Sequence, residues 1–425
     1  MKHFRLLTIL CVIVLTSCWT GMPATSAMEF RMANRWISTA LFSPWYCQDA
    51  WMPDLYHHED LMTALENRIM VSGSIGPSWR YVTHIVTTAD YSTRAHLRGY
   101  AYYVGMFSHE FHRHPDLTWT WREPEKSGEY LTGITFADRL FLSYRSDVFS
   151  ITAGRQPIGL STSFYLTAND FFQPFSAEAI YRDYKPGVDA VVMRFFTGAL
   201  SETGIYMVAG YDRDGEFDRD ESAVLARTSF TTVGFQWELL AGKLPWRLMV
   251  GAAFQGEVGA FGVRAEGHVN IPQTGYETAF GAEDSDNYIH VSGGVDYRFA
   301  NSLHLFFEYF YRGNGYASYD DYLRATVNAG AVRDIYAARH YAVAAATYQW
   351  HPLFTSQIFG VVNLDDSSML MSAFGTFSLA NEADLVIGGY YTLGDKPECR
   401  VGWPYPRSEF GSADRAVSLE LRVYL

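Results

Sequence analysis

Apolar and polar residues alternate along much of this chain, and alternation with a period of two is typical of β-strands that have one apolar and one polar face. Leu140, Leu142 and Tyr144 lie on one face of a predicted strand, and the residues between them, together with Arg145, lie on the other face. The same period continues in 149–154 and in 191–195. The pattern therefore predicts strands at 131–145, 148–157 and 187–197.

The two connections between these strands differ greatly in length. Ser146 and Asp147 leave room only for a tight hairpin turn, whereas 158–186 is a long segment rich in aromatic residues. Barrels of the bacterial outer membrane combine short periplasmic turns with long outer loops. The asymmetry therefore favours a transmembrane β-barrel.

The same alternation occurs along the rest of the chain. It predicts an all-β, antiparallel up-and-down transmembrane barrel of about 16 strands, within a range of roughly 14 to 18. The short turns that we assign to the periplasmic side lie at 146–147, 197–201, 241–245, 299–302, 350–353 and 379–383. They share that side only if 246–270 is one long strand, so we predict it as one. The other predicted strands are 65–76, 79–91, 94–106, 202–211, 224–240, 287–299, 303–312, 337–349, 354–364, 369–379, 384–394 and 414–425.

The N-terminal residues 1–27 have the pattern of an export signal. Lys2 and Arg5 precede the apolar run 6–15, which is too short to span a bilayer, and small residues end at Ala27. We expect cleavage after Ala27, although the residues up to Cys18 also resemble a site at which that cysteine would be lipidated. Residues 28–64 lack steady alternation, so we predict a periplasmic extension or a plug there and place the barrel at 65–425.

The last strand alternates to the end of the chain. Val417, Leu419, Leu421, Val423 and Leu425 lie on one face, and the chain stops on the last of them. Barrel assembly machinery recognises terminal strands of this type, so we expect that machinery as a partner. Pairing with the first strand would close the barrel and remove an uncovered apolar edge.

Composition supports a membrane location. The 425 residues include 29 Tyr, 29 Phe and 11 Trp, many of them near predicted strand ends. Aromatic girdles at the two membrane interfaces account for them better than a soluble β-sandwich does. We therefore expect the outer membrane as the location, with its lipid and lipopolysaccharide as partners. A formal net charge of −13 argues against a nucleic-acid partner.

One run of the sequence resembles a known group. Residues 154–190, GRQPIGLSTSFYLTANDFFQPFSAEAIYRDYKPGVDA, look like the central motif of porin-like β-barrel proteins of the Gram-negative outer membrane, most of them uncharacterised. In that group Gly-Arg-Gln-x-Ile precedes a loop with an Asp-x-Phe element, and Gly-Val-Asp-Ala opens the next strand. This chain departs where Leu160 and Ser161 stand in place of a frequent Trp-Gly. The resemblance implies a barrel with a pore and names no substrate.

Charged residues of the lumen face and of the long loop are the candidates for a pore constriction. On the lipid face an arginine would cost about 2–4 kcal/mol near the midplane, so arginines of the barrel strands should face the lumen. Opposed charges across a narrow pore filter solutes by charge, whereas the alternative is that the loop charges are simply solvated. The candidates are Arg139, Arg145, Arg155 and Arg194 of the strands, and Asp170, Glu178, Arg182, Asp183 and Lys185 of the loop.

Signals for metal binding and catalysis are weak. His109, His112 and His114 are the best candidates for metal ligands, but such loop histidines are more often solvated. No haem-attachment motif and no hydrolase or nucleotide-binding motif is present, so we expect no cofactor and no enzymatic activity.

Three functions are compatible with such a barrel. The first is a porin or channel for passive passage of small polar solutes. The second is a barrel sheath around multihaem cytochromes in an electron conduit, for which a wide polar lumen without a haem motif would suffice. The third, which we favour least, is an outer-membrane barrel hydrolase.

Overall fold

The chain is described by a computed structural model over most of its length. The described residues are 28–42, 59–92, 112–122, 130–172, 174, 184–212, 214–273, 287–318, 336–400, 403–405, 407–412 and 415–425. The predicted export signal and the predicted strand at 94–106 therefore lie outside the described residues. In the described part no helix is both long and apolar enough to cross a membrane.

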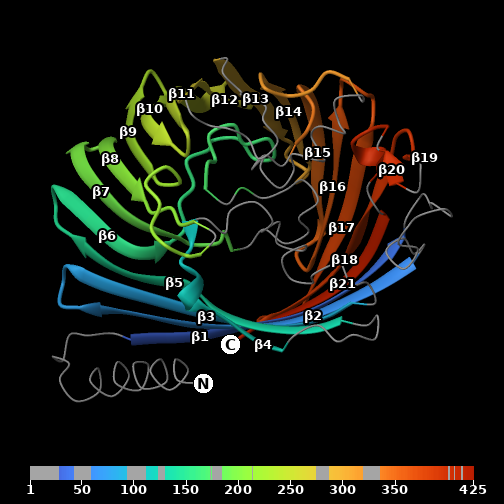
Figure 1. Cartoon of the computed structure of the whole chain (residues 1–425), viewed down its shortest axis with the longest axis horizontal. Coiled ribbons are helices and arrows are strands. Elements are labelled where there is room, and N and C mark those ends of the chain that lie inside the picture. The colour runs from blue at the N-terminus through green and yellow to red at the C-terminus, as the bar shows by residue number, and fades with distance from the viewer. Residues whose placement is uncertain are drawn as a thin grey trace.

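Eighteen of the described strands form the wall of a closed antiparallel barrel (Figure 1). The ring closes because β1 pairs with both β2 and β21, so no wall strand has a free edge. The wall strands are β1 (Met28–Phe42), β2 (Glu59–Ile75), β3 (Trp79–Ser92), β5 (Tyr130–Arg145), β6 (Phe149–Gln156), β7 (Val188–Gly198), β8 (Ser201–Val208), β9 (Ala223–Thr232), β10 (Phe235–Leu244), β11 (Arg247–Val258), β12 (Phe261–Pro272), β13 (Tyr288–Arg298), β14 (His304–Arg312), β15 (His340–His351), β16 (Phe354–Asn363), β17 (Met369–Ala380), β18 (Ala383–Leu393) and β21 (Arg415–Tyr424).

The fold class is confirmed, with 18 strands against the predicted count of about 16. The two long strands predicted at 224–240 and 246–270 are wrong. The structure has four strands there, because tight turns at 233–234 and 259–260 interrupt the alternation. Val233 and Gly234 both adopt positive φ angles, as a two-residue hairpin turn of this kind requires.

A third strand that was not predicted is β1, which occupies residues predicted as a periplasmic extension or plug; the count stays at 18 because β3 pairs directly with β5, so the predicted strand at 94–106 is not among the described wall strands. β1 pairs with β2 from Met28 to Phe42 and with β21 from Ala33 to Phe42. This part of the 28–64 segment is therefore wall. Its alternation is hard to recognise because its lumen face is itself largely apolar, with Ile37 and Leu41 buried.

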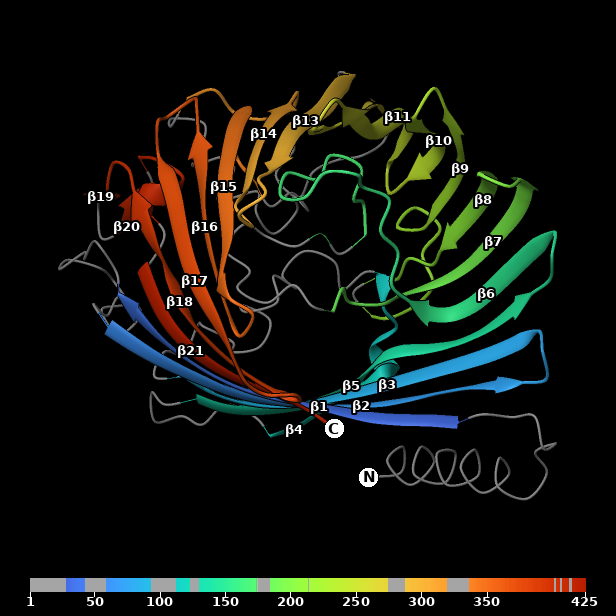
Figure 2. The same cartoon turned by 180° about the vertical axis from the view of Figure 1, so that it is seen from behind.

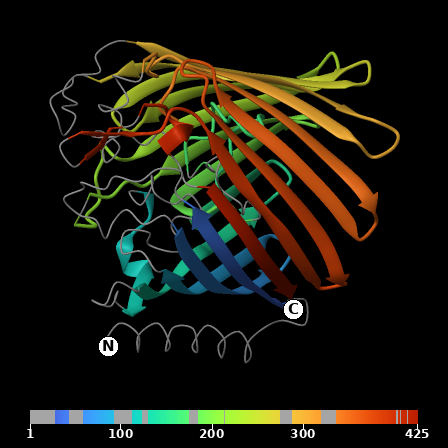
Figure 3. The same ribbon diagram turned by 90° about the vertical axis from the view of Figure 1, so that its right-hand side faces the viewer.

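The tight turns gather at one end of the barrel, as Figure 3 shows. Those at 146–148, 199–200, 352–353 and 381–382 share this end with the C-terminus, and the strand ends that lead into the longer connections lie at the other. The prediction that 241–245 belongs to the turn end is wrong, because β10 and β11 meet in a tight turn at the opposite end. Figure 3 places the C-terminus at the turn end, which by the outer-membrane convention is periplasmic.

Side chains that point away from the barrel are mainly apolar and exposed, for example Leu239 and Ile358. Aromatic residues gather near the tight turns and contact one another between neighbouring strands, as Phe354 and Phe377 do with ring centroids 4.3 Å apart. Trp79 and Tyr144 form a similar pair at 5.0 Å. An apolar band with an aromatic girdle is the outer surface expected of a membrane barrel.

The buried core lies inside the barrel. Leu166 and Ala168, from the segment between β6 and β7, pack with the inward-facing Phe306, Tyr341 and Phe359 of the wall. Figure 2 shows this segment as a trace within the ring of strands. The shorter elements are β4 (Thr118–Arg122), β19 (Glu398–Arg400), β20 (Trp403–Tyr405), η4 (Pro115–Leu117) and η5 (Phe410–Ser412).

Candidate pore constriction

The segment 157–187, here called the inward loop, leaves the wall where β6 ends. β6 pairs with β5 only as far as Arg155, and the rest of β5 pairs on that side with the short strand β4. Gly154 has a φ angle of 118°, and a Cβ there would lie 2.2 Å from the carbonyl oxygen of Leu140. Only glycine allows this departure. The side-chain amide of Gln156 then donates to the carbonyl of Ala190 at 3.1 Å and so ties the start of the loop to β7.

A buried ion pair fixes the base of the inward loop. Arg155 donates to both carboxylate oxygens of Asp189, at 2.7 and 2.8 Å, and to the carbonyls of Ala137 and His114. Its side chain is not exposed at all. Arg155 was predicted as a pore-lining residue, and this is wrong, because every contact of its guanidinium is with the protein. Removing one member of such a pair leaves a buried charge and costs about 3–5 kcal/mol.

Two wall carboxylates, which the sequence analysis did not identify, anchor the far part of the inward loop. Glu308 on β14 accepts three consecutive backbone N–H groups, from Phe164 at 2.7 Å and from Tyr165 and Leu166 at 2.9 Å each. Glu308 is fully buried. Consecutive N–H groups that converge on one anion form a backbone nest, and bonds to a charged acceptor are the stronger kind.

The second anchor is Glu266 on β12. It accepts hydrogen bonds from the Ser161 hydroxyl at 2.7 Å, the Thr162 backbone at 2.6 Å and the Asn169 backbone at 2.9 Å. Farther round the wall, the Tyr165 hydroxyl accepts from the Gln357 amide of β16 at 2.7 Å. The inward loop thus starts at β6 and is bound at β12, β14 and β16, so it crosses the lumen.

Two loop candidates, Asp170 and Lys185, bind each other. The Lys185 ammonium donates to the Asp170 carboxylate at 2.6 Å, and both side chains are largely buried. This pair joins the outgoing and returning parts of the inward loop. Its charges are therefore neutralised within the loop. Glu178, Arg182 and Asp183 lie outside the described residues, so their predicted place in a constriction stays a prediction.

Three predicted arginines lie on the inner wall towards the turn end. Arg145 and Arg194 belong to one register row, since both pair with Ser150 of β6. The Arg145 guanidinium carbon lies 4.8 Å from the ring centroid of Phe196, and that of Arg194 lies 5.9 Å from Tyr206. Neither forms an ion pair with a described carboxylate. Arg139 is partly buried instead, near the ring of Tyr184 and the carboxylate of Asp138.

The inner wall of β1, β2 and β21 holds a separate network of buried charges. Arg68 donates to Asp138 of β5 at 2.6 Å, and Arg35 lies 3.4 Å from Glu66 and 3.5 Å from Glu420. Each of these side chains is 5% exposed or less. Paired in this way, these residues cross-link the wall and are screened from the lumen.

The histidine candidates do not form a metal site in the described part of the chain. His112 packs against Phe172 and its Nδ1 lies 3.1 Å from the Ala209 carbonyl oxygen. The backbone N–H of His114 donates to Asp189, and its ring accepts a hydrogen bond from Asp116. His109 lies outside the described residues, and among those described no three potential ligands cluster.

No protein-family model and no curated protein matches the chain. Its fold is similar to OccK7 (OpdD) of Pseudomonas aeruginosa, with 10% identity, a TM-score of 0.54 and coverage of 95% of this chain and 99% of that one. OccAB1 of Acinetobacter baumannii matches with 9% identity, a TM-score of 0.53 and coverage of 96% and 98%. OccK11 (OpdR) of P. aeruginosa matches with 11% identity, a TM-score of 0.52 and coverage of 95% and 97%. At such low identity the likeness shows a common barrel fold along almost the whole chain.

Proposed function

We propose that this protein is an outer-membrane porin, a channel for passive passage of small polar solutes that is narrowed by the inward loop. The observation that carries the proposal is the anchoring of that loop across the lumen by Glu266 and Glu308. A closed wall with an apolar outer band provides the membrane span, and a loop bound across the lumen sets how wide the remaining path is.

The arginine row of the inner wall gives the proposed channel its charge preference. Arg145 and Arg194 share their register row with Arg227, since the row continues through Gly204 of β8. Arg227 is neutralised by Glu238, to which it donates at 2.8 Å. The other two carry uncompensated positive charge among the described residues, and positive charge on a pore wall raises the local concentration of anions. The channel should therefore prefer anions to cations.

The anchored loop argues against the two other functions that the sequence left open. A sheath for multihaem cytochromes needs an unobstructed lumen, whereas Leu166 and Phe172 of the inward loop are packed against the wall inside it. The two serines of this loop among the described residues are engaged in structural bonds: Ser161 binds Glu266, and Ser163 binds Ser292 at 2.7 Å. These contacts stabilise the loop and give no support to a hydrolase.

Planar-bilayer recording of the purified protein tests the proposal. We expect discrete conductance steps, and a reversal potential under a salt gradient that reports anion preference. Boiled protein is the control, since closed barrels resist detergent until they are heated. A protein that fractionates with the outer membrane and yields no conductance would contradict the porin function.

A further inference from the structure

A row of polar side chains crosses the lipid-facing surface of β1, β2, β3 and β5. Asn34 pairs in register with Asn67, Asn67 with Thr87, and Thr87 with Thr135. The Asn67 amide donates to the Asn34 carbonyl oxygen at 2.7 Å, and the two threonine hydroxyls are 3.1 Å apart. A second pair on the same face, Ser38 and Thr63, is hydrogen-bonded at 2.9 Å.

The orientation of this row follows from the alternation of burial on β2. Glu66 and Arg68, on either side of Asn67, face the lumen and are buried, whereas Leu65 and Ile69 are exposed on the outer face. Asn67 is also the middle residue of β2. It therefore lies within the apolar band, at the depth of the hydrocarbon core.

Polar groups at this depth are costly unless they are hydrogen-bonded. The bond between Asn34 and Asn67 uses one amide hydrogen and one carbonyl oxygen. One amide nitrogen and one carbonyl oxygen of the pair are left without a partner among the described residues. Lipid tails cannot supply either a donor or an acceptor, so the row needs another protein surface to satisfy it.

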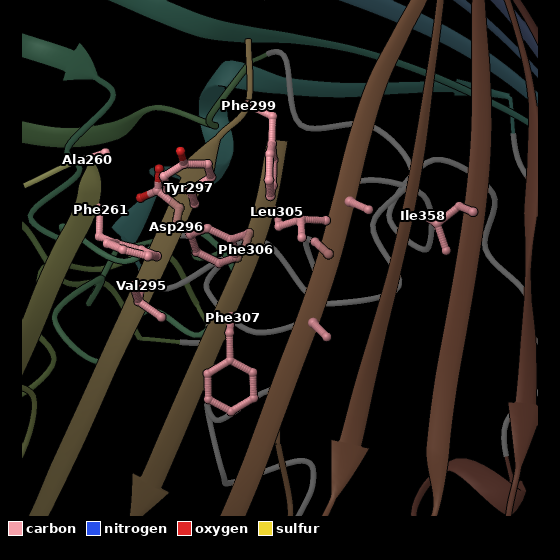
Figure 4. A pocket seen from close by; sticks show the side chains of 13 residues that line it. Ala260, Phe261, Val295, Asp296, Tyr297, Phe299, Leu305, Phe306, Phe307 and Ile358 are labelled. Atoms are coloured by element: carbon pink, nitrogen blue, oxygen red, sulfur yellow. The ribbon is translucent and has the colours of Figure 1, made fainter. Parts of the chain in front are cut away.

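The opposite wall, which faces β1 to β3 across the ring in Figure 1, has a different outer surface. Figure 4 shows a groove there, on strands β12 to β16, and its outward residues are apolar or aromatic. Phe261, Val295, Leu305, Phe307 and Ile358 border it, and Ala344 and Ala346 leave it shallow. This surface suits acyl chains, and the described residues that line the groove form no comparable row of polar side chains.

We propose that the outer face of β1, β2, β3 and β5 is an interface with a second copy of this chain. The unpaired groups are self-complementary, because each copy offers one amide donor and one carbonyl acceptor. A twofold axis through the row would let each donor bind the acceptor of the other copy, which is the property of an isologous interface. The proposal does not depend on what the channel conducts.

The available area is sufficient for such an interface. Four neighbouring strands at about 4.8 Å spacing give a face roughly 19 Å wide, and the hydrocarbon band is about 30 Å tall. Each copy would then bury up to about 600 Å², or about 1,200 Å² in total. A specific interface is expected to exceed about 1,000 Å².

Cysteine cross-linking in isolated outer membranes tests the proposal. Cys47 and Cys399 are first replaced by serine, and Leu65→Cys is then introduced next to the row. The matched control is Ile358→Cys, on β16 in the groove sector, because both positions are outward-facing and similarly exposed, at 56% and 54%. We expect oxidation to give a species of twice the monomer mass with Leu65→Cys, and about tenfold less of it with Ile358→Cys.

A second arm removes the polar row. In the Leu65→Cys protein, Asn34→Leu with Asn67→Leu should lower the dimer yield about tenfold, since a hydrogen bond between membrane segments contributes about threefold and two are lost. Retained heat-modifiable migration shows that this variant is folded. Three results would each overturn the proposal: equal cross-linking at the two cysteine positions, no cross-linking at either position, or a product that contains a different protein. The first two results do not depend on the folding of the leucine variant.

Discussion

The anchoring of the inward loop by Glu308 leads to a quantitative prediction for Glu308→Gln. In the wild-type protein one carboxylate accepts three N–H groups, from Phe164, Tyr165 and Leu166. A glutamine of the same shape has one oxygen acceptor, and its amide nitrogen would face a donor. At least one buried N–H group then loses its partner, and the other bonds are no longer charge-assisted.

The loss can be put in figures from typical hydrogen-bond energies. A buried donor without a partner costs about 1–3 kcal/mol, and a bond to a charged acceptor exceeds a neutral one by about 1 kcal/mol. The anchored loop should therefore lose about 3–5 kcal/mol relative to the detached loop. At about 1.4 kcal/mol for each factor of ten, the detached population rises by a factor of roughly 100 to 4,000.

Single-channel recording measures this change. We expect Glu308→Gln to show larger open-channel noise and visits to a higher conductance, because a detached loop no longer narrows the lumen in one fixed way. Glu238→Gln is the matched control: Glu238 is also a buried wall carboxylate, but it binds Arg227 and not the inward loop. Both variants lose one negative charge, so a change specific to Glu308→Gln isolates the anchoring. Traces of Glu308→Gln that match the wild type would refute the assignment of Glu308 as an anchor.

Three further predictions concern other parts of the barrel. Arg194→Glu should move the reversal potential towards cation preference, and an unchanged potential would show that this residue is remote from the ion path. Gly154→Ala should destabilise the barrel by at least about 2 kcal/mol, because of backbone strain and a clash of the new Cβ with Leu140. Gly76→Ala should cost less, because Gly76 also has a positive φ but a Cβ there would meet no atom within 4 Å. The temperature at which the band of the folded barrel shifts on a detergent gel compares the two variants. Burial raises the pKa of Glu409 to about 7, against the effect of a hydrogen bond from the Tyr341 hydroxyl. A carboxyl with a raised pKa stabilises the folded state at low pH, and this contribution is lost as pH rises towards and through about 7. Proteolysis of the outer loops should therefore accelerate over that pH interval in the wild type. It should not accelerate in Glu409→Gln, which cannot lose this proton.

The architecture of the wall was largely predictable because its outer face meets a uniform solvent. Lipid selects apolar residues at every second position, and this local rule marks strands such as β5, β6, β7 and β21 whatever their neighbours are. The rule fails where the lumen face is also apolar, as in β1, where Ile37 and Leu41 belong to the core cluster that also contains Leu166 and Ala168 of the inward loop. It also fails at two-residue turns such as Val233-Gly234, since such a turn interrupts the alternation by shifting its phase by only one residue.

The candidate site depended more heavily on contacts between distant parts of the chain. The sequence alone determined that 158–186 is a long loop following a glycine-containing strand end, and that Arg194 faces the lumen. The prediction that Arg155 lines the pore was wrong because its side chain binds Asp189. Asp189 becomes its neighbour only when β6 pairs with β7 in the folded sheet. The roles of Glu266 and Glu308 were equally hidden, since a carboxylate on a lumen face has the same local pattern whether it meets water or a loop. Only the closure of the barrel brings the backbone of residues 161–169 within 3 Å of these two side chains, and so decides that they hold the loop in place.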